Sequence, residues 1–192
     1  MNIIALIPAK GNSNRLPNKN LYLLKGKPLL CWTIDAAKKS KYLHEIYVST
    51  ENKEIKKKAL ENNVKVIDRP LELSGNSIGK QEVLEHALSI IEKDENIDVI
   101  CMLQANSPEL KHEKIDEAIE KIINSNGKVW DCISINKETL FTDGAIRVFQ
   151  RHCVNEKGIG MYKAIVLTDY IDVHYMEDVK TIETRMDINK NV

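Results

Sequence analysis

Residues 2–20 read NIIALIPAKGNSNRLPNKN, an apolar run followed by a polar loop that carries three basic residues. The run over Asn2–Pro8 is almost continuously apolar, which is typical of a strand buried on both faces of a parallel sheet. The loop after it is rich in Gly, Asn and Ser, which favour turns and can expose backbone N–H groups. Because open α/β sheets bind ligands at the carboxyl ends of their strands, this loop is the first candidate for a binding site.

The rest of the chain alternates short apolar runs with amphipathic segments, the pattern of an α/β sheet with crossover helices. We expect further strands at Glu45–Thr50, Val64–Asp68, Asp98–Leu103, Val129–Ile135, Ala145–Phe149 and Tyr162–Thr168. We expect helices at Pro28–Ser40, Asn52–Asn62, Lys80–Glu92, Glu113–Ser125 and Glu177–Arg185. This order predicts a Rossmann-like α/β fold, a mostly parallel sheet flanked by helices, with residues 1–192 forming one domain. The long connection Arg69–Gly79 is a candidate functional loop.

The composition excludes several classes of protein. Among 192 residues, 28 Lys and Arg balance 28 Asp and Glu, so we expect no binding of nucleic acid or membrane by bulk charge. Apolar residues make up 43% of the chain, which argues against disorder, and no apolar run approaches the ~20 residues of a membrane span. The four cysteines show no CxxC spacing and predict reduced thiols. Because the first residues lack the basic region of a signal peptide, we expect a cytoplasmic protein.

The loop after the first strand has the chemistry of a phosphate site. Lys10, Arg15 and Lys19 place three cations within ten residues, a density that suits a triphosphate. The loop contains neither GxGxxG nor GxxxxGK[ST], so a dinucleotide enzyme or a P-loop hydrolase is disfavoured. The alternative interpretation is an ordinary basic surface turn.

Several motifs in the first 110 residues occur in a familiar order. They are Pro8-Ala9-Lys10-Gly11-Asn12-Ser13, Leu16-Pro17-Asn18-Lys19-Asn20, Gly26-Lys27-Pro28-Leu29, Val48-Ser49-Thr50, Arg69-Pro70 and Leu103-Gln104-Ala105-Asn106-Ser107-Pro108. On these motifs the chain resembles the acylneuraminate cytidylyltransferase family, which includes the CMP-sialate and CMP-Kdo synthetases and has a GT-A-like nucleotidyltransferase fold. The span Pro108–Gly144 is short for that family, in the region that builds the acceptor pocket and the family dimer.

The resemblance implies a cytidylyltransferase that transfers CMP from CTP to the hydroxyl of an acidic sugar, a nonulosonic acid or Kdo, with release of pyrophosphate. It implies catalytic roles in charge stabilisation for Lys10, Arg15 and Lys19. The nucleotide would be held by Ala9, Lys10, Gly11, Asn12, Ser13, Lys19, Asn20, Arg69, Lys80, Gln104, Ala105, Asn106 and Ser107. Asn20 would support the loop, and Lys80 stands where the family often has a Ser that contacts the base.

The resemblance also implies a divalent cation, Mg²⁺ with Mn²⁺ as a possibility, at Asp172 and His174. His174 replaces the second aspartate of the family's I-D-I-D motif, and imidazole suits Mn²⁺ better than Mg²⁺. The acidic acceptor would contact residues of the second half of the chain, namely Asp143, Arg147 and Lys163. Gly158 and Gly160 predict a turn beside the site, either a lid or a plain hairpin.

Two alternatives stay open from the residues. The acceptor could be a smaller acidic or phosphorylated molecule, because Asp143 and Arg147 replace the family's sugar-contacting Asn and Tyr. The chain could also be a catalytically impaired nucleotide-binding protein, for which His174 and Lys10 are the main support. A homodimer weaker than the family norm is expected from the short span before Gly144.

Overall fold

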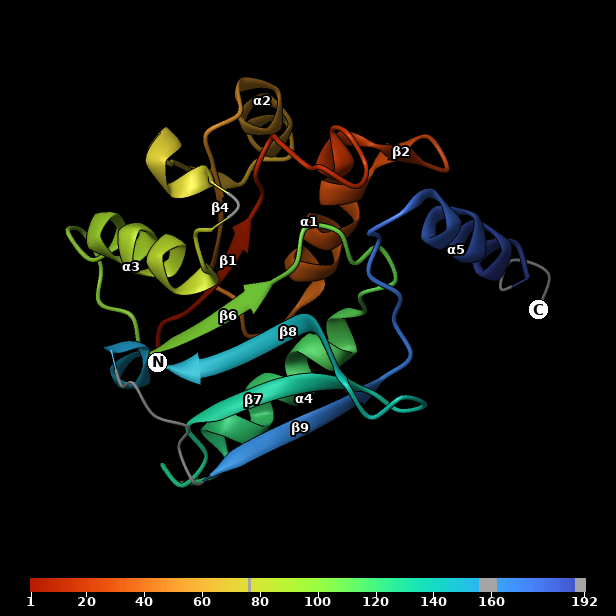
Figure 1. Cartoon of the computed structure of the whole chain (residues 1–192). Coiled ribbons are helices and arrows are strands. Elements are labelled where there is room, and N and C mark those ends of the chain that lie inside the picture. The colour runs from red at the N-terminus through yellow and green to blue at the C-terminus, as the bar shows by residue number, and fades with distance from the viewer. Residues whose placement is uncertain (76, 156–161, 189–192) are drawn as a thin grey trace.

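The computed structural model describes residues 1–75, 77–155 and 162–188, and Gly158 and Gly160 lie outside these ranges. Seven strands form one sheet in the order β5-β4-β1-β6-β8-β7-β9 (Figure 1). Their bounds are β1 Ile3–Pro8, β4 Glu45–Thr50, β5 Lys65–Asp68, β6 Val99–Leu103, β7 Asp131–Asn136, β8 Thr142–Gln150 and β9 Lys163–Thr168. Only β8 runs against its neighbours in this sheet, so the predicted mostly parallel sheet is confirmed.

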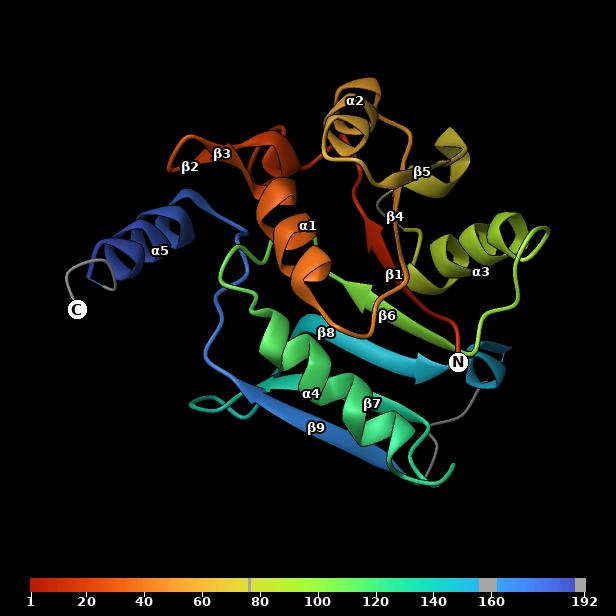
Figure 2. The same ribbon diagram turned by 180° about the vertical axis from the view of Figure 1, so that it is seen from behind.

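Helices cover both faces of the sheet. The helices are α1 Leu29–Lys39, α2 Lys53–Glu61, α3 Lys80–Ile91, α4 His112–Ile123 and α5 Met176–Ile188. The helices α1, α2 and α4 share one apolar cluster on one face (Figure 2), and α3 packs on the other. Along β1, Ile3, Ala5 and Ile7 join the first cluster. Ile4 and Leu6 join the second, which is why this strand is apolar at every position.

A third apolar cluster anchors the loop after β1 to α5. Leu16 packs with Leu24 and Leu29 from the N-terminal region and with Val179 and Ile182 of α5. These contacts bring the last described helix close to the first loop, although the two are far apart in the sequence (Figure 1).

The sequence analysis missed the shortest elements. These are the 3₁₀ turns η1 Lys19–Leu21, η2 Leu71–Ser74 and η3 Arg151–Asn155, and the two-residue strands β2 Leu23–Leu24 and β3 Lys27–Pro28. A two-residue strand cannot show alternation, and a single 3₁₀ turn is too short to show a helical period of hydrophobic residues. Within the described ranges, no helix is long and apolar enough to cross a membrane. All four cysteines are free thiols, as predicted.

Candidate active site

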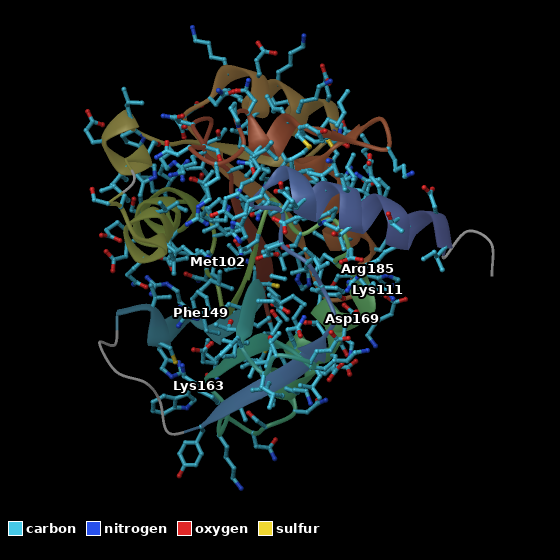
Figure 3. The ribbon with its side chains drawn as sticks, turned by 45° about the vertical axis from the view of Figure 1, so that its right-hand side comes forward. Met102, Lys111, Phe149, Lys163, Asp169 and Arg185 are labelled. Carbon is cyan, nitrogen blue, oxygen red and sulfur yellow. The ribbon has the colours of Figure 1, made fainter. Side chains whose placement is uncertain are left out.

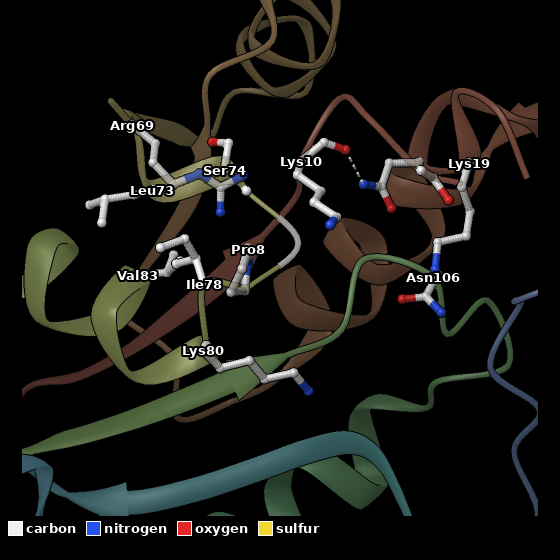
Figure 4. A pocket seen from close by; sticks show the side chains of 14 residues that line it. Pro8, Lys10, Lys19, Arg69, Leu73, Ser74, Ile78, Lys80, Val83 and Asn106 are labelled. Carbon is white, nitrogen blue, oxygen red and sulfur yellow. Dashed lines mark hydrogen bonds between the residues drawn. The ribbon is translucent and has the colours of Figure 1, made fainter. Parts of the chain in front are cut away.

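Two adjoining cavities lie at the carboxyl ends of the parallel strands. The first has a volume of about 210 Å³ and lies between the loop after β1 and the segment that leads from Arg69 into α3. Of the predicted nucleotide-binding residues, it is lined by Lys10, Ser13, Lys19, Asn20, Arg69, Lys80 and Asn106 (Figure 4). The second has a volume of about 260 Å³ and lies over β6 and β8. The fold thus brings together residues from the first, second and third quarters of the chain.

Hydrogen bonds fix the loop after β1. The side chain of Asn20 is buried and its Nδ2 donates to the Lys10 carbonyl at 2.9 Å, the supporting role predicted for this residue. The backbone N–H of Gly11 donates to Oε1 of Glu51 at 2.7 Å. A Cβ on Gly11 would lie 2.4 Å from Nδ2 of Asn52, so any other residue here would displace that helix-capping side chain. Gly11 is therefore required by a close approach of the loop to α2.

Glu51 connects this loop to Arg69. Its Oε2 accepts from Nη2 of Arg69 at 2.7 Å and from Oγ of Ser74 at 2.9 Å. Burial favours the neutral acid, yet the hydrogen bonds from Arg69, Gly11 and Ser74 hold the pKa of Glu51 below its ordinary value. The Arg69 Nε is buried and has no partner among the described residues, which leaves a donor for a ligand. Sequence reasoning missed Glu51, although it follows Val48-Ser49-Thr50 where the family has Asp.

Three lysines face the first cavity from different elements. Lys10 belongs to the loop after β1, Lys19 begins η1, and Lys80 begins α3 (Figure 4). Desolvation lowers the pKa of Lys19, and the nearby cations of Arg15 and Lys10 add to the effect while Asp172 opposes it. Desolvation also lowers the pKa of Lys80. Such a convergence of positive charge is stabilised by an anion.

Not every predicted residue of the loop reaches the cavity. Ala9 is fully buried in the core, and the exposed side chain of Asn12 does not line the cavity. The guanidinium of Arg15 lies 5.5 Å from the ring centre of Tyr175, outside the cavity lining. Arg15 therefore contributes its charge at the rim, through its effect on Lys19.

The end of β6 is tied to the segment before α5. Oδ2 of Asp172 accepts from Nε2 of Gln104 at 2.7 Å, and Oδ1 accepts from the Ser107 hydroxyl. Asn106 exchanges two hydrogen bonds of 2.9 Å with the backbone of Val173. Burial raises the pKa of Asp172 to about 6, with Asp143 adding to the shift and Ser107, Lys80 and Lys19 opposing it. The Asp172 carboxylate thus lies near two of the three lysines, Lys19 and Lys80.

The donor set fits a divalent cation only in part. Asp172 offers hard oxygen atoms, which suit Mg²⁺. Burial and the cations Lys19 and Arg15 lower the pKa of His174, so its imidazole is neutral at pH 7 and able to ligate. Within the described ranges, no three His, Cys, Asp or Glu side chains are grouped so that they could hold a metal. Further ligands for a cation here would have to come from phosphate oxygens and water.

The second cavity combines charged and apolar groups. Lys80 and Arg147 supply the charge, and the apolar lining includes Met102, Ile133 and Ile146. Gly144, at φ 69°, forms part of the wall, and a Cβ there would lie 2.5 Å from Nε2 of Gln104. A glycine is therefore needed both for its backbone conformation and for the position of Gln104.

Asp143, one of the three residues predicted to bind the acceptor, lines neither cavity. Its carboxylate accepts from the hydroxyls of Ser134 and Thr168 and from the Ala145 N–H at 2.9 Å. It thereby joins β7, β8 and β9 instead of facing the second cavity. Asp143, which replaces the family's sugar-contacting Asn, therefore joins three strands of the sheet by hydrogen bonds.

Lys163, a second residue predicted to bind the acceptor, also lines neither cavity. It begins β9 and lies 3.4 Å from Oδ2 of Asp131 at the start of β7. Because β7 and β9 run parallel, both residues lie at the amino ends of these strands, whereas the cavities are at the carboxyl ends. Lys163 and Asp169 mark opposite ends of β9 in Figure 3. Arg147 is the one predicted acceptor residue that lines the second cavity.

A Rossmann-like sheet with a cationic loop after its first strand is the architecture of a nucleotidyltransferase. The sequence agrees, because residues 4–154 match the cytidylyltransferase family. The chain therefore belongs to the cytidylyltransferase family, as its motifs predicted.

Three cytidylyltransferases with different sugar acceptors in their names are similar to this chain in sequence. The chain is 38% identical over 120 residues to N-acylneuraminate cytidylyltransferase A of Danio rerio, an alignment that covers 62% of this chain and 27% of that protein. It is 32% identical over 130 residues to pseudaminic acid cytidylyltransferase of Campylobacter jejuni, covering 67% and 56%. It is 35% identical over 124 residues to 3-deoxy-manno-octulosonate cytidylyltransferase of Bdellovibrio bacteriovorus, covering 65% and 47%. The matched region thus spans between 27% and 56% of these relatives.

Solved structures show the same fold over nearly the whole chain. CMP:2-keto-3-deoxy-manno-octonic acid synthetase complexed with CTP has a TM-score of 0.78 at 12% identity, covering 98% of this chain and 100% of that one. A cytidylyltransferase from Leptospira borgpetersenii has a TM-score of 0.76 at 16% identity, covering 98% and 87%. The predicted fold class is confirmed by these neighbours.

Proposed function

We propose that residues 1–192 act as a single nucleotidyltransferase domain that transfers CMP from CTP to the hydroxyl of an acidic sugar and releases pyrophosphate. The observation that carries the proposal is the convergence of Lys10, Lys19 and Lys80 on one cavity at the carboxyl ends of the strands. The acceptor class is supported by the relatives, whose names specify acylneuraminate, pseudaminic acid and 3-deoxy-manno-octulosonate.

In this proposal the first cavity holds CTP. Lys10 and Lys19 bind the phosphates, and Arg69, with its unpartnered Nε, binds the cytosine or its ribose. Gln104, Asn106 and Ser107 hold the nucleotide from the end of β6, either directly or through Asp172. Because the lysines lie in a partly desolvated site, they stabilise the charge that grows on the leaving pyrophosphate more strongly than solvent would.

The transfer needs no covalent enzyme intermediate. The acceptor hydroxyl attacks the α-phosphorus in line with the leaving group and loses its proton to solvent, while the bond from the α-phosphorus to the bridging oxygen of pyrophosphate breaks. A divalent cation, Mg²⁺ or Mn²⁺, would neutralise phosphate charge when it is bound, with Asp172 and His174 as its protein ligands. Asp172 keeps its orientation through Gln104 and Ser107.

The test is release of pyrophosphate from each of the four nucleoside triphosphates, with an acylneuraminate or 3-deoxy-manno-octulosonate as acceptor. We expect release with CTP and a loss of at least about 100-fold in kcat/KM for Lys19→Gln, because a transition-state contact of about 3 kcal/mol is removed. The matched control is Lys121→Gln on the surface of α4, which should change little. CTP binding without release from any acceptor would favour the catalytically impaired nucleotide-binding protein.

We further propose that the enzyme works in the cytoplasm and forms at most a weak homodimer. The short span between Pro108 and Gly144 supports the second statement, because the family's dimer arm would fall there. Light scattering at micromolar concentration should show mainly monomer, and a tight dimer would contradict this.

A further inference from the structure

Lys80 has a position that the nucleotide role alone does not explain. It lines both cavities, together with Pro8 and Asn106, and is the charged member of these three. Its Nζ lies 3.7 Å from where a Cβ on Gly144 would stand, at the wall of the second cavity. Within the described ranges its ammonium forms no ion pair, and the nearby charges that act on it are Asp172 and Arg147. The side chain therefore points from α3 toward the second cavity.

Arg147 is the second cation of this cavity, on the strand opposite Lys80. Its Nε and Nη2 donate to the carboxylate of Asp131 at 3.3 and 3.1 Å, and its guanidinium carbon lies 5.0 Å from the ring centre of Phe149. These contacts orient the guanidinium plane and leave Nη1 for another acceptor. The side chain is 50% exposed, so a ligand in the cavity can reach it.

Lys80 and Arg147 both line the second cavity, so their positive charges face the same space, and like charges that share a cavity repel each other. Desolvation lowers the pKa of Lys80, and the charge of Arg147 adds to this effect while that of Asp172 opposes it. The carboxylate of Asp131 offsets part of the positive charge of Arg147, but it also pairs with Lys163. The Asp131 side chain is only 10% exposed. An anionic group between Lys80 and Arg147 would relieve this repulsion.

Part of the cavity lining is apolar and includes Met102, Ile133 and Ile146, beside the polar side chains of Gln104, Asn106 and Thr142. Met102, Arg147 and Ile133 form one row across β6, β8 and β7, because the strand register pairs them directly. The carboxylate of Asp143 does not line the cavity, because Ser134 and Thr168 hold it inside the sheet. The cavity thus offers two donors for one anion and an apolar surface for the part beside it.

We propose that Lys80 and Arg147 form the binding site for the acidic group of the acceptor, and that this group is a single carboxylate. This inference rests on the proposed function and replaces Lys163 by Lys80 as the partner of Arg147. One uncompensated lysine and one arginine already paired with Asp131 match one negative charge better than the two of a phosphate. The carboxyl group of the acceptor would then lie beside the junction of the two cavities, within reach of the nucleotide.

The experiment is calorimetric titration of the full chain with 3-deoxy-manno-octulosonate, with its methyl ester, and with glycerol 3-phosphate, which carries a phosphate and no carboxylate. We expect the acid to bind at least about 10-fold more tightly than the neutral ester, since charge-assisted hydrogen bonds are lost in the ester. The variants Lys80→Gln and Arg147→Gln should each weaken binding of the acid by about 10-fold and leave binding of the ester unchanged. Lys163→Gln and the surface control Lys121→Gln should bind the acid like the unsubstituted protein.

Several outcomes would overturn the assignment. The carboxylate site would be disproved by any of three results: equal affinities for acid and ester, no binding of the acid, or an unchanged affinity for the acid in Lys80→Gln. Tighter binding of glycerol 3-phosphate than of 3-deoxy-manno-octulosonate would show that the site binds a phosphate and not a carboxylate. A parallel titration with CTP distinguishes failure of this inference from failure of the proposed function. If CTP does not bind, the proposed function is contradicted. The difference in affinity between the acid and its ester tests the carboxylate site in either case.

Discussion

Nη2 of Arg69 donates to Oε2 of Glu51 at 2.7 Å, and the two side chains are only 3% and 12% exposed. This ion pair lies behind the first cavity, where the same carboxylate also accepts from the backbone of Gly11. The nucleotide loop and the residue proposed to bind the base are therefore positioned by one acidic side chain. A buried pair of this kind contributes little net stability, but removal of one partner leaves a buried charge.

Glu51→Ala should therefore destabilise the protein by about 3 kcal/mol, because Arg69 and the Gly11 N–H lose their acceptor. Urea unfolding followed by circular dichroism measures the change. The control Glu61→Ala removes an exposed carboxylate that pairs with Lys58, and should change the free energy of unfolding far less, because solvent screens an exposed ion pair. Equal effects of the two substitutions would show that Glu51 has no special role.

The pKa of Asp172 predicts a dependence of stability on pH. Its folded-state pKa of about 6 lies above the ordinary value of 3.8 for this side chain, so the folded protein binds the proton more tightly than the unfolded chain. The associated stabilisation is complete below about pH 4 and is lost as the pH rises through 6. Asp172→Asn removes this titration. Between pH 4 and 7, in EDTA, the original protein should lose on the order of 2 kcal/mol relative to the variant. A constant difference across that range would contradict the burial of this carboxylate.

Gly144→Ala tests the wall between the two cavities. Both Gly144 and Gly127 have positive φ, 69° and 79°, so alanine at either position should cost about 1 kcal/mol of stability through the backbone. At Gly127 a Cβ would meet nothing within 4 Å, whereas at Gly144 it would displace Gln104. We expect Gly144→Ala to lower the rate of pyrophosphate release by at least about 10-fold beyond Gly127→Ala, because Asp172 loses a hydrogen-bond donor. Similar rates for the two variants would show that Gln104 is not needed in this orientation.

His174→Asp tests whether the imidazole limits metal binding. A carboxylate would add hard oxygen ligands near Asp172, so the concentration of Mg²⁺ needed for half-maximal turnover should fall by about 10-fold. The measurement is pyrophosphate release as a function of Mg²⁺ and Mn²⁺ concentration. His44→Asp, far from the cavities, is the matched control. If the variant gains no activity and the original protein has none, the chain is a nucleotide-binding protein.

Much of the sheet could be predicted because a strand that is buried on both faces is apolar at nearly every position. The runs at Asn2–Pro8 and Asp98–Leu103 were placed to within one residue at each end, as β1 and β6. The first cavity could also be predicted in outline, because its cations follow a strand and match a family motif. The two-residue strands β2 and β3 could not, since their pairing depends on one turn at Lys25 and Gly26.

The acceptor side was less predictable because its contacts are between distant segments. Nothing near Asp143 in the sequence shows that Thr168 and Ser134 would take up its carboxylate. Nothing near Lys163 shows which end of its strand faces the cavities, since that depends on parallel pairing with β7. Lys80 was found through its nucleotide motif, but its second position beside Arg147 follows only from the fold.

CMP transfer is tested most directly by following the labelled α-phosphate of CTP in the presence of Mg²⁺ and either 3-deoxy-manno-octulosonate or an acylneuraminate. We expect the label to move from CTP to a sugar-linked CMP, and we expect no such product from labelled UTP, ATP or GTP. Lys19→Gln should slow formation of the product by at least about 100-fold. If the label stays in CTP with every acid, or moves equally well from all four nucleotides, the central claim of CMP transfer to an acidic sugar is wrong.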